Sequence, residues 1–203
     1  MNDSWNLTEL REHIRRLGDD NRHLSETVDS IDRSVTIFRY HLVMARDALK
    51  GIIDNRNLSN NLELVLGVSG KQRNYKYAML VSEAHIISCI LTTRSIYDIF
   101  AQLLNGLLLE RKIPVHLCDI TKVRKHLPQS RLKEELGELL LSDWFEYIVA
   151  FTNTAKHRNL IGHNLTVSSE ENIAGVRIEQ FPYNGKTYPA YWANEVLEGG
   201  CGG

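Results

Sequence analysis

The sequence predicts a mainly α-helical fold, an up-and-down bundle of four to five helices with a small β-hairpin appendage at its C-terminal end. Most of the chain spaces its apolar residues at the helical period and holds few helix breakers. Strand-like alternation is confined to the last fifth of the chain. The 203 residues are 43% hydrophobic and 24% charged, as is typical of a globular domain with a sizeable core.

The first 55 residues predict a short helix followed by a long one. Ser4 is a candidate N-cap for the short helix, and Gly18 is expected to interrupt the helical run. Residues 55–72 hold Asn, Ser and Gly at the density of a turn. We expect them to form a loop with some local order.

Residues 74–110 carry the strongest helical pattern, with an apolar surface wide enough for the centre of a bundle. Arg94, Asp98, Gln102 and Asn105 follow one another at spacings of four, four and three, so they form a polar line along this helix. The line is either an exposed stripe with an Arg94–Asp98 ion pair, worth a few tenths of a kcal/mol, or a functional or interface stripe. Both interpretations remain open.

The following residues predict two shorter helices, at about 118–126 and 129–141, with a break at Pro128. Their many basic side chains favour a solvated face over a contact with RNA. A last long helix is expected to start at Ser142 and Asp143. Its apolar residues recur at spacings of four, three and four and predict one buried stripe: Trp144, Ile148, Phe151 and Ala155.

The residues after this helix predict strands, because LTVSS and GVRIEQF are β-branched or alternating. Asn184-Gly185 is a strong signal for a tight hairpin turn. We therefore expect a helical bundle over residues 1–165, with variable N-terminal helices, and a β-hairpin appendage with a flexible tail over residues 166–203.

Composition narrows the classes of function. A net charge of -1 argues against a protein that coats nucleic acid, although it allows a local basic site. Three sparse cysteines favour a reducing compartment, so we expect the cytoplasm. The chain shows no apolar run of the roughly 18 residues that span a bilayer, so no membrane association is expected. The absence of ligand-spaced Asp, Glu, His and Cys clusters, and of a phosphate-binding glycine loop, predicts no metal and no cofactor.

The segment KHRNLIGHN concentrates nitrogen-bearing side chains at the end of the last helix. On an ideal helix Arg158 lies within about 40° of the apolar stripe, so we expect it to point toward the bundle. Lys156, Asn159 and His163 group on another side, roughly 60–120° away. Asn159 and His163 are four residues apart, so Asn159 is placed to orient the imidazole.

Arg158 and His163 are about 140° apart around an ideal helix. Either the helix ends before His163, which Gly162 would permit, or a second copy of the chain completes the site. A purely structural explanation also remains open. In it, Arg158 pairs with a bundle carboxylate such as Asp98, and His163 is a helix C-terminal histidine favoured by the dipole.

The pattern R-N-x-x-x-H, from Arg158 to His163, resembles the Rx4-6H motif of the HEPN superfamily (higher eukaryotes and prokaryotes nucleotide-binding). The tail NTAKHRNLIGH, followed by strands, FPYNGKTYP and a tryptophan, resembles one branch of that superfamily over about the last third of the chain. The resemblance implies a small helical bundle, a homodimer, RNA as substrate and a regulatory protein partner. It also implies a metal-independent endoribonuclease, in a toxin or phage-defence context.

In such an enzyme the 2′-OH of RNA attacks the adjacent phosphate. His163 would transfer protons and Arg158 would stabilise the phosphoryl oxygens, with Asn159 orienting either group. Two motifs facing each other across a two-fold axis would supply both an acid and a base. Five further residues are candidates for substrate binding: Lys156, His157, Asn153, Arg94 and Asp98.

Other functions fit the same residues. The chain is alternatively a non-catalytic HEPN module that binds RNA or a nucleotide, or a helical dimerisation scaffold. A third hypothesis is a structural protein whose hairpin docks a partner through its aromatic residues. Some HEPN toxins carry a tyrosine, modified by a partner nucleotidyltransferase, where this chain has Leu165. Regulation of that kind is not expected here.

Overall fold

The computed structural model describes residues 6–18, 21–53, 58–170 and 173–199. The chain divides into two compact units. The first consists of Met1–Ile37 and Arg94–Ser142, and the second of Phe38–Thr93 and Asp143–Gly203. The candidate cap Ser4 lies outside the described residues.

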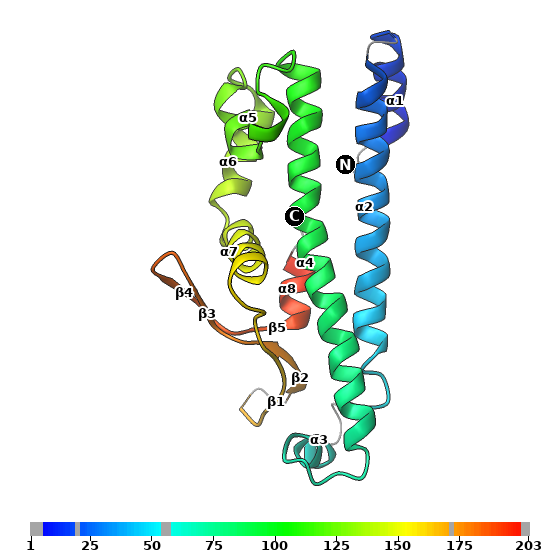
Figure 1. The fold of residues 1–203 in the computed structure, drawn as a ribbon, viewed down its shortest axis with the longest axis vertical. Helices are drawn as coiled ribbons and strands as arrows, with labels where there is room; N and C mark the ends of the chain where they lie inside the picture. The colour runs from blue at the N-terminus through cyan, green and yellow to red at the C-terminus, as the bar shows by residue number, and fades with distance from the viewer. Residues whose placement is uncertain (1–5, 19–20, 54–57, 171–172, 200–203) are drawn as a thin grey trace. The chain divides into compact units, whose positions relative to one another are not determined.

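The described residues are mainly helical, as predicted, but they form eight α-helices where four to five were expected (Figure 1). The sequence indicates six helical segments in all, and the two helices beyond these are a short one in the segment expected to be a loop and another in the C-terminal tail. In chain order the helices are α1 (Leu7–Arg16), α2 (Arg22–Asp47), α3 (Leu58–Val65), α4 (Gln72–Leu108), the short 3-10 helix η2 (Val115–Leu117), α5 (Ile120–His126), α6 (Arg131–Leu141), α7 (Asp143–His157) and α8 (Ala193–Gly199).

The first unit has a core made by apolar residues of α1, α2 and α4. Asn6 caps α1, because its side chain accepts a hydrogen bond from the backbone N–H of Glu9. The buried members of this core lie at helical spacings, as the sequence indicated: Ile14, Leu24, Val28, Ile31 and Leu103.

The strands of the second unit share one core with its helices. β2 (Ile173–Ile178), which pairs with β1 (His163–Ser168), contributes Val176 and Ile178 to the same buried cluster as α7. The C-terminal strands are therefore part of the unit that contains α7, whereas the sequence suggested an appendage that starts after residue 165. The largest apolar side chains of this shared core come from α4, α7 and the strands: Ile86, Ile90, Ile148, Phe151, Ile178 and Phe181.

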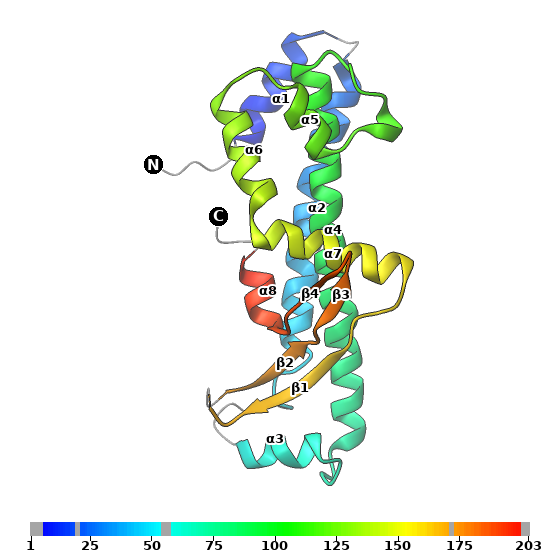
Figure 2. The same cartoon turned by 90° about the vertical axis from the view of Figure 1, so that its left-hand side faces the viewer.

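The strands form two antiparallel sheets (Figure 2). β1 pairs with β2, and β2 pairs with β5 (Tyr191–Trp192). A separate hairpin joins β3 (Phe181–Tyr183) to β4 (Lys186–Tyr188). Its turn is Asn184-Gly185, with φ values of 48° and 80°. Two positive φ values are the property of a type I′ turn, so the hairpin prediction is confirmed.

The expectation of a loop between α2 and α4 is wrong for α3. Its residues Leu58, Asn61 and Leu64 recur at spacings of three, and Asn61 and Leu64 are buried. α3 contacts β1 and β2, which lie next to it (Figure 2). The high Asn and Ser content of the sequence concealed this short amphipathic helix, because tertiary burial overrides weak local propensity. Among the described residues, no helix combines the length and the apolarity that crossing a bilayer requires.

Candidate functional site

Helix α7 ends before the second half of the KHRNLIGHN segment. The backbone N–H groups of Arg158 and Asn159 both donate to the carbonyl oxygen of Thr154, at 2.9 and 3.2 Å, and regular helix stops at His157. His163 is the first residue of β1. Of the two geometries that the sequence left open, the helix that ends early is therefore the one observed. His163 is not a helix C-terminal histidine.

Arg158 is exposed, and the expectation that it points into the bundle is wrong. On the side of α7 where the buried stripe ends, the neighbour is β3 and not another helix. The Cζ atom of Arg158 lies 5.3 Å from the ring centroid of Tyr183, and its Nη1 donates to the carbonyl oxygen of Pro182 at 3.4 Å. No carboxylate pairs with Arg158 within the part of the chain that the structure describes.

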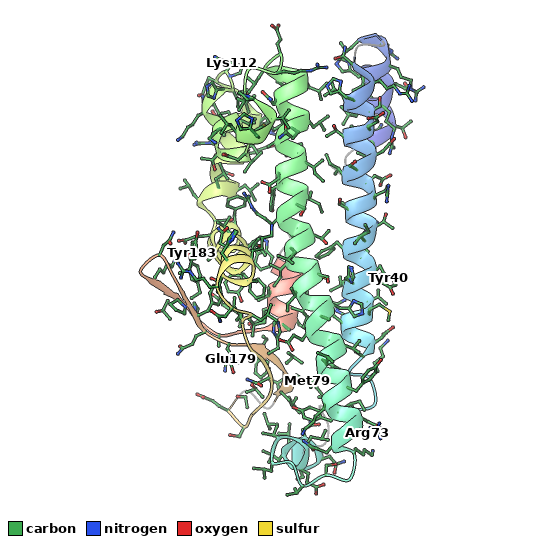
Figure 3. The ribbon with its side chains drawn as sticks, in the orientation of Figure 1. Tyr40, Arg73, Met79, Lys112, Glu179 and Tyr183 are labelled. Atoms are coloured by element: carbon green, nitrogen blue, oxygen red, sulfur yellow. The ribbon has the colours of Figure 1, made fainter. Side chains whose placement is uncertain are left out.

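Tyr183 connects β3 to the end of α7 (Figure 3). The side-chain amide of Asn153 donates to the Tyr183 hydroxyl at 3.0 Å, and Arg158 covers the ring of the same tyrosine. A cation–π contact at an exposed site contributes about 0.5–1 kcal/mol. The hydrogen bond from Asn153 positions the Tyr183 ring, and the cation–π contact places the Arg158 side chain against the face of that ring.

Lys156, His157, Arg158 and Asn159 are four consecutive exposed residues, which we call the basic segment. The Nδ2 of Asn159 donates to the carbonyl oxygen of Leu160 at 3.0 Å. The expected contact between Asn159 and the imidazole of His163 is therefore not formed. The basic segment presents three basic side chains and one amide to solvent.

The side chain of His163 is enclosed, with an exposed fraction of 0%. Its Nδ1 lies 3.0 Å from the carbonyl oxygen of Ile161 and 3.5 Å from a carboxylate oxygen of Glu83. Because a carbonyl oxygen only accepts, Nδ1 carries the proton of the neutral ring. Nε2 is then an acceptor, and it has no hydrogen-bond partner among the described residues. Burial lowers the pKa of His163, although the carboxylate of Glu83 acts in the opposite direction.

Two carboxylates near His163 were missed by the sequence analysis. Glu83, on α4, approaches the imidazole directly. Glu179 follows β2, where its backbone N–H donates to the carbonyl oxygen of Gly162 at 2.9 Å and its carboxylate accepts from the amide of Asn164. A signal for Glu83 was present in the sequence, because it interrupts the apolar run AMLVSEAHIISCIL. No local pattern indicates Glu179.

Arg94 and Asp98, the remaining candidates for substrate binding, belong to the first unit. They form an ion pair, with 3.0 Å between Nη2 and Oδ1. The pair matches the interpretation of the polar line as a stripe with an internal ion pair. Asp98 is thus already paired, and the basic segment lies in the second unit.

The other two residues of the polar line anchor the segment that follows α4. Gln102 donates to the carbonyl oxygen of Val115 at 2.9 Å. Asn105 is buried and makes two hydrogen bonds with the backbone of Ile113. Its Nδ2 donates to the Ile113 carbonyl oxygen at 2.8 Å, and its Oδ1 accepts from the Ile113 N–H at 3.1 Å. Two buried hydrogen bonds to one residue fix the turn after α4, so this part of the line has a structural role.

The second unit also contains a cavity of about 430 Å³, lined by residues of α2, α4, β2 and α8. None of the candidate site residues lines it. Among the described residues, no group of three or more His, Cys, Asp or Glu side chains is placed to hold a metal ion.

The segment from Lys156 to His163 thus combines exposed basic side chains beside an aromatic ring with an enclosed histidine. No family model, curated protein or solved structure matches the chain.

Proposed function

We propose that this chain is an RNA-binding protein of HEPN type, and that the basic segment binds the sugar–phosphate backbone of single-stranded or loop RNA. The observation that carries the proposal is the exposure of three consecutive basic residues, Lys156, His157 and Arg158, with Arg158 held against Tyr183. The resemblance of the surrounding sequence to HEPN proteins supports the same class of ligand.

These side chains suit a phosphate ligand. The forked guanidinium of Arg158 matches two phosphate oxygens, and Lys156 supplies a mobile point charge. Proteins that bind single-stranded RNA combine such cations with aromatic or guanidinium planes on which bases stack. The Arg158–Tyr183 pair provides one plane of each kind. A net charge of -1 for the whole chain suits a short footprint on RNA.

The test is fluorescence anisotropy with a labelled single-stranded RNA in EDTA at low salt. Removing one phosphate contact weakens binding by about three- to tenfold, so the double variant Lys156→Ala/Arg158→Ala should bind about 10- to 100-fold more weakly than the wild type. Lys125→Ala removes an exposed lysine from α5 in the first unit and is the matched control. Wild-type affinity in the double variant would refute the proposal.

Metal-independent cleavage of RNA is a second candidate function, and one observation favours it. Burial lowers the pKa of His163 and so favours the neutral ring, and its Nε2 has no hydrogen-bond partner among the described residues, as a general base requires. Its side chain is enclosed, so cleavage requires a conformation in which the loop from Arg158 to His163 opens to RNA. In the homodimer that the HEPN resemblance implies, two such loops would face each other.

Cleavage is tested by incubating RNA with the purified protein in EDTA, with His163→Gln beside the wild type. Products with 2′,3′-cyclic phosphate ends in the wild-type sample alone would establish the nuclease. Intact RNA in both samples, together with the binding described above, would identify a non-catalytic module.

A further inference from the structure

A second cavity of the second unit, with a volume of about 280 Å³, lies at the start of α7. Residues of α7, β5 and α8 form its walls. Three of them are aromatic, two are acidic and one is aliphatic: Trp144, Tyr147, Tyr191, Asp143, Glu195 and Val196.

The three aromatic rings form the sides of a cage. The rings of Trp144 and Tyr147 are nearly parallel, at 14°, with centroids 6.2 Å apart. The ring of Tyr191 stands at 81° to that of Tyr147, with centroids 5.3 Å apart. The three rings therefore pack against one another beside the cavity, and the faces of aromatic rings carry negative electrostatic potential.

Two polar groups of the cage have no hydrogen-bond partner among the described residues. They are the hydroxyl of Tyr147, a residue that is only 3% exposed, and the indole N–H of Trp144. Buried donors are nearly always paired in native proteins. Burial also raises the pKa of Tyr147, so its hydroxyl stays protonated and available as a donor. The cavity therefore lies beside two buried donors that have no partner among the described residues.

The charges around the cavity favour a cation. Asp143 and Glu195 are exposed carboxylates, and the six lining residues include no basic side chain. Glu195 is held in place because it accepts the backbone N–H of Trp192 at 3.1 Å. The nearby cation, Lys186, is paired with Glu146 at 2.6 Å and lies over the ring of Tyr188.

We propose that this cavity binds an organic ammonium cation. The alkyl groups on the nitrogen would lie against the aromatic faces, as in other aromatic cages. The carboxylates of Asp143 and Glu195 would balance the charge. This cavity is separate from the basic segment proposed to bind RNA, because the carboxylates of Asp143 and Glu195 would repel a phosphate.

The test uses choline as the probe and heteronuclear NMR of the indole N–H groups in the full chain, without RNA. The Trp144 resonance is assigned by its loss in Trp144→Phe. Choline should shift this resonance saturably, and the neutral analogue, in which a tert-butyl group replaces the trimethylammonium group, should bind at least about tenfold more weakly.

Two variants complete the experiment. Glu195→Gln removes a charge but keeps an acceptor for the Trp192 N–H, and we expect it to weaken choline binding by about three- to tenfold. Tyr191→Leu removes one wall of the cage and should weaken binding by a similar factor. Glu138→Gln, an exposed position on α6 in the first unit, is the control and should leave the affinity unchanged.

The proposal is overturned by any of three results. The first is a Trp144 resonance that does not move at choline concentrations up to about 50 mM. The second is equal binding of choline and its neutral analogue. The third is an unchanged affinity in Glu195→Gln, whose remaining spectrum reports that the chain is folded.

Discussion

His163 and Arg158 are five residues apart, yet their surroundings are opposite. Arg158 is exposed beside Tyr183, whereas the imidazole of His163 is enclosed by β1, α4 and α7. Enclosure disfavours the charged form of the imidazole, because the interior solvates an ion poorly. The stability of the protein should therefore depend on the protonation of His163.

We expect acid to destabilise the fold through His163. The folded-state pKa lies below the ordinary value of 6.5, so the unfolded chain binds the proton more tightly. The stabilisation is complete above pH 6.5 and is lost as the pH falls from there through the folded pKa. Urea unfolding at pH 7.5 and at lower pH should show a loss of stability that is smaller in His163→Gln.

His116→Gln replaces an exposed histidine of η2 and is the control. An equal acid sensitivity in the wild type and in His163→Gln would contradict the prediction. In that case the acidic neighbours of the imidazole, Glu83 and Glu179, would hold it in the charged form.

The surroundings of this loop were only partly predictable from the sequence. Periodicity correctly identified α7, the strands after it and the Asn184-Gly185 turn, because these features depend on neighbouring residues. The predicted direction of the Arg158 side chain was wrong, because its angle on an ideal helix does not indicate which element packs beside the end of α7. The enclosure of His163 depends on Glu83, 80 positions earlier in the sequence, and no local pattern reports such a contact.

At the scale of elements, a glycine of α4 leaves room for a side chain of α2. A Cβ atom on Gly106 of α4 would collide with a methyl group of Leu24, which is 2% exposed on α2. Glycine is unfavourable in a helix interior by about 1 kcal/mol relative to alanine. Close packing against Leu24 explains why it is nevertheless found there.

Gly106→Ala should therefore lower the free energy of unfolding by about 1–2 kcal/mol, because the cost of overpacking exceeds the gain in helix propensity. The same substitution in a Leu24→Ala background should raise stability by up to about 1 kcal/mol, because space is then available. Denaturant unfolding of the four chains measures both effects. The same sign in both backgrounds would show that Leu24 does not determine the effect.

The β3–β4 hairpin depends on its turn. Gly185 has a φ of 80°, a region in which an L residue costs about 1–2 kcal/mol. Gly185→Ala should destabilise the protein by that amount and should also weaken RNA binding, since the hairpin carries Tyr183. Gly70→Ala is the matched control, because a Cβ there meets no atom within 4 Å and its φ is not positive. Equal stabilities of the two variants, measured by thermal unfolding, would count against a strained turn.

At the scale of the whole molecule, the near-zero net charge limits how much of the surface attracts RNA. If Lys156 and Arg158 make the phosphate contacts, the logarithm of the binding constant should fall with the logarithm of salt concentration with a slope of about -1.4. Lys156→Ala should reduce the magnitude of that slope by about 0.7. A much steeper slope in the wild type would mean that basic residues elsewhere, such as those of α5, also bind.

The division into two units also has a consequence for how the chain folds while it is being synthesised. Neither unit is one continuous stretch of sequence, because the boundaries fall inside α2 and α4. A chain that leaves the ribosome completes the first unit at Ser142. The apolar residues Ile86 and Ile90 on α4 must wait for α7 and the strands, which follow more than fifty positions later. During translation this part of α4 is a nascent hydrophobic surface, and a chaperone that binds exposed apolar helices would find it there.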